Sequence, residues 1–122
     1  MIGSAHLPDS VSMVTGWCLH DLGRPKAAAE ALDRECARIP AVALRTQTRY
    51  GMRRALAHAA AGEIEHSCEI AGRLLDTVVA VPSATVNADV RRLARELARF
   101  RANRAVRDLQ PTLAQVLSPS RA

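Results

Sequence analysis

The chain has 122 residues, nearly half of them apolar, which is enough for one domain with a substantial core and below the size at which chains usually split. Seventeen basic residues against twelve acidic residues give a net charge of +5, and all the basic residues except Lys26 are arginine. No run approaches the roughly 18 apolar residues of a membrane span, and the start lacks a basic region followed by an apolar one, so we expect a cytoplasmic protein.

The first helix is predicted to begin at Asp9 or Ser10 and to end at Gly23. Its apolar face would comprise Val11, Val14, Cys18 and Leu22. A second helix is predicted from Pro25, which suits a first turn, to Pro40, with inward residues Ala28, Leu32, Cys36 and Ile39.

The third helix is predicted over residues 43–61, closed by Gly62. Its inward side would carry Leu44, Met52, Leu56 and either Ala59 or Ala60. The fourth is predicted to follow at once and to stop at Pro82, with its buried side formed by Ile64, Ser67 or Cys68, Ala71, Leu74, Leu75 and Val78.

The fifth helix has the sharpest periodicity in the chain. It starts at Ser83 or Asn87 and places on one seam Val86, Val90, Leu93, Leu97 and Phe100. The last helix begins near Arg104, and Pro111 should kink or split it because proline lacks a backbone donor. We therefore expect a flexible tail over residues 1–8, one helical-repeat domain over 9–117 and a frayed end over 118–122.

Composition and spacing together predict an all-α fold. Aromatic residues are limited to Trp17, Tyr50 and Phe100, so alanine, leucine and valine must form the core, as in closely packed helices. The segments 23–36 and 62–75 repeat one device, in which a glycine ends a helix and a small residue follows five positions later. This pattern predicts about six helices in stacked antiparallel hairpins of the tetratricopeptide-like type, which expose a binding groove.

The glycine turns, followed by the segments 91–97 (RRLAREL) and 103–109 (NRAVRDL), resemble a known protein region. The resemblance covers residues 16–117 and is to the C-terminal tetratricopeptide-like region of actinobacterial Xre-type helix-turn-helix transcriptional regulators. It implies protein–protein interaction in transcription regulation, with a peptide, protein or small-molecule signal, or dimerisation. The DNA-binding part of that family has no counterpart here, which leaves open a fragment, a stand-alone relative or a partner of such a regulator.

Chemical motifs are few. Around Gly62 the residues that could ligate a metal are His58, Glu63, Glu65, His66, Cys68 and Glu69. Their spacing matches no known zinc or catalytic motif, and we favour an interpretation in which Glu63 and Glu65 stabilise a helix N-terminus while His66 and Glu69 are solvated. The three cysteines, Cys18, Cys36 and Cys68, are interpreted as separate buried thiols. We expect no enzyme activity, metal or cofactor.

The candidate binding residues are two arginine stripes and one tryptophan. The stripes are Arg45, Arg49 and Arg53 with Arg54, and Arg92, Arg95 and Arg99 with Arg91. A solvated face is favoured over nucleic-acid binding because stacking aromatics are scarce, and acidic peptides suit arginine forks equally well. Trp17 is either an interface anchor or a cap on the first hairpin.

The sequence therefore favours a non-enzymatic interaction module for a protein or peptide in a bacterial regulatory system. The alternative is a small basic nucleic-acid-binding subunit that uses the arginine stripes. A homodimer is expected, because so short an array leaves an apolar end uncovered.

Overall fold

The computed structural model describes residues 17–118, and all regular structure in this range is helical. A short helical segment over residues 17–21 is followed in chain order by α2 (Pro25–Cys36), α3 (Leu44–Ala60), α4 (Ile64–Ala80), α5 (Ala84–Leu97), the 3-10 helix η1 (Ala98–Phe100) and α6 (Arg104–Leu117). The prediction of an all-α chain is confirmed. The expected tail over 1–8, the helix start at Asp9 and the frayed residues 119–122 lie outside the described range.

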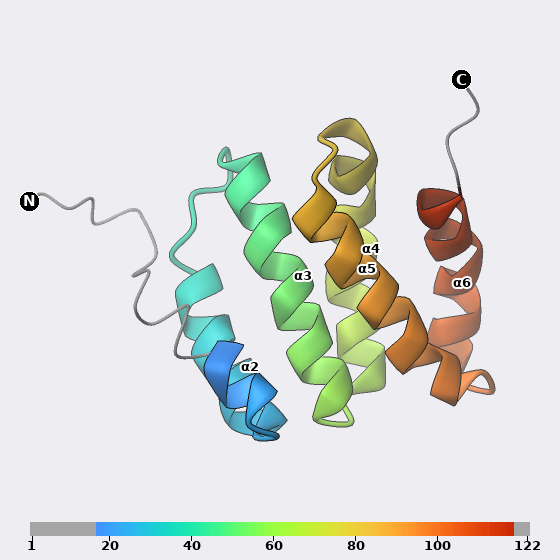
Figure 1. The fold of residues 1–122 in the computed structure, drawn as a ribbon, viewed down its shortest axis with the longest axis horizontal. Coiled ribbons are helices and arrows are strands. Elements are labelled where there is room, and N and C mark those ends of the chain that lie inside the picture. The colour runs from blue at the N-terminus through green and yellow to red at the C-terminus, as the bar shows by residue number, and fades with distance from the viewer. Residues whose placement is uncertain (1–16, 119–122) are drawn as a thin grey trace, which may run out of the picture.

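Helix α3 occupies the middle of the arrangement (Figure 1). It packs against α2, α4 and α5, while α6 packs against α4 and α5. The two hairpins, α3 with α4 and α5 with α6, lie side by side, so that α3 runs in the same direction as α5 and α4 in the same direction as α6 (Figure 1). The more specific prediction, that these hairpins are tetratricopeptide-like repeats, stays a prediction.

Both glycines that were predicted to end helices do so in the same way. Gly23 and Gly62 have φ of 78° and 87°, a region that glycine enters without steric cost. After α3 the amide of Glu63 donates to the carbonyl of His58 at 2.9 Å, and that of Gly62 donates to Ala59 at 3.0 Å. The same pair of bonds surrounds Gly23, so each turn is a Schellman motif that satisfies the last carbonyls of its helix.

The turn between α5 and α6 uses a different device. Helix α5 tightens into η1, and Asn103 then caps α6 by accepting hydrogen bonds from the amides of Ala105 and Val106. The amide group of the same side chain donates to Glu65 Oε2 at 2.9 Å, which links the starts of α4 and α6. This hairpin therefore needs no glycine.

Small residues allow the helices to approach closely. Ala28, Ala55 and Ala71 are fully buried, and the hydroxyl of fully buried Ser67 donates to the carbonyl of Ala55 at 2.7 Å across the α3–α4 contact. Larger side chains from α3 to α6 fill the main core, which contains Met52, Leu75, Val90, Leu93, Leu97, Val106 and Leu113. A smaller cluster joins α2 to α3 and contains Ala28, Ala29, Leu32, Ile39 and Ala57.

Several inward assignments were wrong. Trp17 and His20 face the protein in the helical segment 17–21, and this orientation leaves Cys18 exposed. Leu22 is 75% exposed because it follows the last helical residue and no longer obeys the helical period, and Leu44 is 54% exposed because it opens α3 beyond the contact with its neighbours. Of the two alternatives at the end of α3, Ala59 is buried as predicted, and Ala60, at the last position of the helix, is exposed.

Two helix boundaries also differ from expectation. The second helix ends at Cys36 and not at Pro40, because residues 37–39 form a turn that buries Ile39. Pro111 does not split the last helix, since α6 runs through it without interruption. The proline ring lies on an exposed position, where a carbonyl that loses its intrahelical partner can be hydrated.

Candidate functional site

The two helices that carry the arginine stripes lie next to each other, and two hollows are found along their junction. One, of about 350 Å³, lies at the C-terminal end of α3 and is lined by His20, Gly23, Pro25, Leu56, Ala60, Arg92 and Glu96. The other, of about 150 Å³, lies at the N-terminal end and is lined by Arg45, Thr48, Arg49, Val81, Pro82, Ser83 and Val86. We call this surface, with the residues between the hollows, the α3–α5 face.

Trp17 brings the two stripes together between these hollows. The guanidinium carbon of Arg53 lies 5.0 Å from the centroid of the Trp17 ring, and that of Arg92 lies 5.3 Å from it. The imidazole of His20 stacks on Trp17 at a centroid distance of 4.6 Å and an interplanar angle of 8°. An indole attracts guanidinium groups through its negative face, so three elements, the segment 17–21, α3 and α5, meet at this ring.

A carboxylate lies among these arginines. The side chain of Asp89 on α5 is only 8% exposed, and its Oδ2 lies 3.6 Å from Arg53 Nε, close enough for an ion pair but too far for a hydrogen bond. Within residues 17–118 no hydrogen-bond partner reaches either of these buried atoms, nor the buried Nδ1 of His20.

Burial shifts the ionisation of this cluster. It raises the pKa of Asp89 above its ordinary value, although Arg53 and Arg92 act in the opposite direction. It also lowers the pKa of His20, and the positive charge of Arg92 adds to that effect. The charged form of Asp89 is therefore kept in an unfavourable environment, which is more common at binding sites than in ordinary cores.

The structure brings together only part of the predicted set. Trp17, Arg53 and Arg92 meet directly, and Arg49 is near enough for its charge to act on Asp89. The remaining predicted residues lie elsewhere: Arg45 lines the smaller hollow, Arg95 is exposed, Arg99 pairs with Glu96 at 3.2 Å, and Arg54 pairs with Asp33 on α2.

Asp89 and His20 were missed. The sequence signal for Asp89 was its place one residue before Val90 and three after Val86, on the seam that α5 buries. A carboxylate on an apolar seam needs a partner or a role. His20 carried no comparable signal, because the orientation of the segment 17–21 was misassigned.

A second polar cluster lies where α2 meets the turn around Gly62. The imidazole of His58 is almost fully buried, with Nδ1 at 2.7 Å from Glu63 Oε1 and Nε2 at 2.8 Å from Asp33 Oδ1. Arg54 donates a further hydrogen bond to Asp33. Burial alone would raise the pKa of Asp33, but the hydrogen bonds from Arg54 and His58 outweigh it and hold that pKa below its ordinary value.

This cluster joins α2 to α3 and to the start of α4. Some of the candidate ligands around Gly62 contact each other, but no group of three or more histidine, cysteine or acidic residues in the range 17–118 is arranged to hold a metal ion. His66 packs edge to face on His58 instead, with centroids 4.6 Å apart, and pairs with Glu69 at 3.5 Å. The arrangement is one that fixes helices in place.

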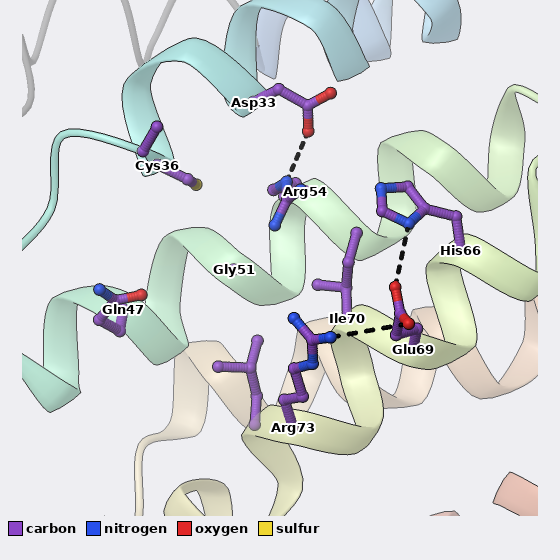
Figure 2. A pocket seen from close by; sticks show the side chains of 11 residues that line it. Asp33, Cys36, Gln47, Gly51, Arg54, His66, Glu69, Ile70 and Arg73 are labelled. Carbon is purple, nitrogen blue, oxygen red and sulfur yellow. Dashed lines mark hydrogen bonds and ion pairs between the residues drawn. The ribbon is translucent and has the colours of Figure 1, made fainter. Parts of the chain in front are cut away.

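A cleft of about 290 Å³ lies between α2, α3 and α4. Figure 2 shows the side chains that line it. Gly51 and Ile70 contribute to its apolar part, and its charged groups are paired with each other: Asp33 with Arg54, and Glu69 with Arg73 at 3.6 Å and with His66. Cys36 also lines it, and burial raises the pKa of its thiol to about 11, so very little reactive thiolate exists at neutral pH. With its charges already paired, this cleft offers a ligand less than the α3–α5 face does.

Comparison with known proteins adds no relative to this picture. No family model, curated protein or solved structure matches the chain. Among the described residues, no helix is both long and apolar enough to pass through a membrane. The case for a function therefore depends on the geometry of the chain itself.

Proposed function

We propose that the protein is a non-enzymatic interaction module that binds a segment of a partner protein or a peptide along the α3–α5 face. The observation that carries this proposal is the convergence of Trp17, Arg53 and Arg92 from three separate elements between two hollows. Aromatic and arginine side chains dominate the binding energy of protein interfaces. Hollows on either side can accept the side chains of a bound segment.

The charge arrangement favours a protein partner over nucleic acid. Asp89 lies in the middle of the cluster as a hydrogen-bond acceptor, to which a peptide N–H can donate and a phosphodiester cannot, and Arg54 and Arg99 already hold acidic partners. Duplex binding would need arginines that are free to neutralise several successive phosphates. The nucleic-acid-binding subunit is kept as the alternative because Arg45, Arg49, Arg91, Arg92 and Arg95 are exposed.

The resemblance to the C-terminal regions of Xre-type regulators supports a place in a bacterial regulatory system. In that family such regions receive a peptide, protein or small-molecule signal. A module that holds a partner segment suits this setting, and its surface needs no catalytic group.

Selection from a randomised peptide library displayed on phage tests the proposal. Selected peptides should bind the intact chain and lose affinity about tenfold or more with Arg92→Gln, because a charge-assisted contact is removed. Arg107→Gln, on the exposed side of α6, is the matched control and should leave affinity unchanged. Peptides that bind both variants equally well would place the binding surface elsewhere.

The alternative has its own measurement. Affinity for duplex and single-stranded oligonucleotides is titrated between 50 and 300 mM salt, where phosphate contacts give a steep decline with salt. We expect no tight binding at physiological salt. Tight binding with a slope that implies several phosphate contacts would overturn the interaction-module proposal in favour of a nucleic-acid-binding subunit.

A further inference from the structure

The buried ion pair of Arg53 and Asp89, next to Trp17, leaves its two facing atoms without a hydrogen bond in the described part of the chain. Arg53 Nε is a donor and Asp89 Oδ2 an acceptor; they lie 3.6 Å apart, and neither has a hydrogen-bond partner among residues 17–118. Both atoms are buried, while Trp17 lies against the guanidinium groups of Arg53 and Arg92. An indole face attracts a guanidinium but cannot accept a directed hydrogen bond from Nε as an oxygen does, nor donate one to a carboxylate.

The donor and acceptor together define the chemistry of a better occupant. A carboxylate would accept from the guanidinium groups of Arg53 and Arg92, and a neighbouring N–H would donate to Asp89. An aspartate or glutamate within a peptide offers both, since its backbone amide lies close to its side-chain oxygens. A phosphodiester offers acceptors alone and cannot donate a hydrogen bond to Asp89, so the site favours a peptide carboxylate with its neighbouring N–H over a nucleic-acid backbone.

Trp17 stands where that occupant would have to approach. Its ring touches the main core and the smaller α2 cluster without being fully buried in either. It belongs to the short helical segment 17–21, which joins α2 through the turn at Gly23. Arg92 is at an exposed position, so displacing this ring would free the face of its guanidinium group that now lies against the indole, together with that of Arg53.

We propose that Trp17 is an intramolecular cover over an acidic-peptide site formed by Arg53, Arg92 and Asp89, and that a partner segment binds by displacing the indole. This inference rests on the proposed function and names the chemistry of the partner. Binding is then coupled to a movement of the segment 17–21, and the affinity measured is reduced by the fraction of molecules in which the cover is closed.

Trp17 is the only tryptophan of the chain and reports directly on this movement. The intact protein is titrated with an acetylated, amidated hexaglutamate peptide, and emission and acrylamide quenching are recorded. We expect a saturable red shift and stronger quenching, no response to a hexaglutamine peptide, and loss of the response in Arg53→Gln but not in Arg107→Gln. Two results would overturn the proposal that Trp17 covers the site. In one, calorimetry detects binding of hexaglutamate but the tryptophan emission does not change. In the other, hexaglutamate does not bind.

A variant without the cover provides a second test. Trp17→Leu should bind hexaglutamate about tenfold more tightly, because the closed state no longer competes. Equal or weaker binding by a folded Trp17→Leu chain would show that the indole is part of the binding surface. If this variant does not fold, the fluorescence titration of the wild-type protein still tests whether Trp17 is displaced by the peptide.

The two proposals can fail separately. If library peptides need Arg92 for binding but leave the Trp17 emission unchanged, the proposal that Trp17 covers the site is wrong, and the proposal of an interaction module still holds. A short oligothymidylate that produces the same red shift as hexaglutamate at equal ionic strength would contradict the acidic-peptide chemistry of the site.

Discussion

Alanine determines how closely the helices of this chain can approach. Ala28 is fully buried in the cluster that joins α2 to α3. We expect Ala28→Leu to lower the free energy of unfolding by about 1 to 3 kcal/mol, because added methyl groups force neighbouring side chains out of their rotamers. Arg45→Ala, at an exposed position, should cost under about 0.5 kcal/mol. Equal effects in urea melts would contradict the assigned faces.

Asp33 should make stability depend on pH in the acid range. Its pKa is held below the ordinary value of 3.8, so its ion pairs stabilise the fold fully above that value. The contribution is lost as pH falls through the lower pKa of the folded state, where the carboxylate takes up its proton. The stability difference between wild type and Asp33→Asn should therefore narrow as the pH falls below about 4.

Urea melts at a series of pH values measure this difference. Asp108→Asn, on the exposed side of α6, is the control for a general change in charge. A gap between wild type and Asp33→Asn that stays constant from neutral pH into strong acid would show that the carboxylate contributes nothing through its ionisation.

At the scale of elements, the glycines of this chain have opposite roles. Gly62 has φ of 87°, which alanine adopts only with strain, whereas Gly72 lies within α4 with an open side, its nearest contact to an added Cβ being Leu109 Cδ1 at 3.8 Å. We expect Gly62→Ala to destabilise the fold by about 1 kcal/mol and Gly72→Ala to stabilise it by about 0.5 to 1 kcal/mol. Thermal melts followed by circular dichroism should shift in opposite directions. A stabilising Gly62→Ala would argue against the Schellman turn.

At this scale, the features that could be predicted from the sequence are those that neighbouring residues along the chain determine. The period of α5, its cap at Ser83 and the turns at Gly23 and Gly62 follow from residues within one or two helical turns of each other. The cluster of Asp33 with His58 depends on residues 25 positions apart, and no local rule places them together. The orientation of Trp17 was out of reach for a related reason, because only the packing of α3 beside α5 gives the ring its two arginines.

For the whole molecule, the expected homodimer stays a prediction, and we expect its contact to cover an exposed apolar side chain. The exposed positions of α6 are mostly polar and include Arg104, Arg107, Asp108, Thr112 and Gln115. Leu22, in contrast, is 75% exposed near the opposite end of the array. A two-fold contact around Leu22 would cover this apolar side chain on both copies.

Light scattering coupled to gel filtration tests the assembly. We expect twice the 13.2 kDa chain mass at tens of micromolar, and a shift toward one chain with Leu22→Ser but not with Gln115→Ser. If the wild-type protein has the mass of one chain under these conditions, the prediction of a homodimer is wrong. A dimer unaffected by Leu22→Ser would place the contact on another surface.

The links between helices also bear on how the chain reaches its structure. The hydrogen bonds between helices described above include pairs of residues 12 positions apart, as in Ala55 with Ser67, and 38 apart, as in Glu65 with Asn103. Closing such short loops costs little chain entropy, and helical proteins with local contacts fold in microseconds to milliseconds. Translation adds about 5 to 20 residues per second. The α3–α4 hairpin can therefore form while α6 is still being synthesised, whereas the main core closes only when the side chains of α5 and α6 become available.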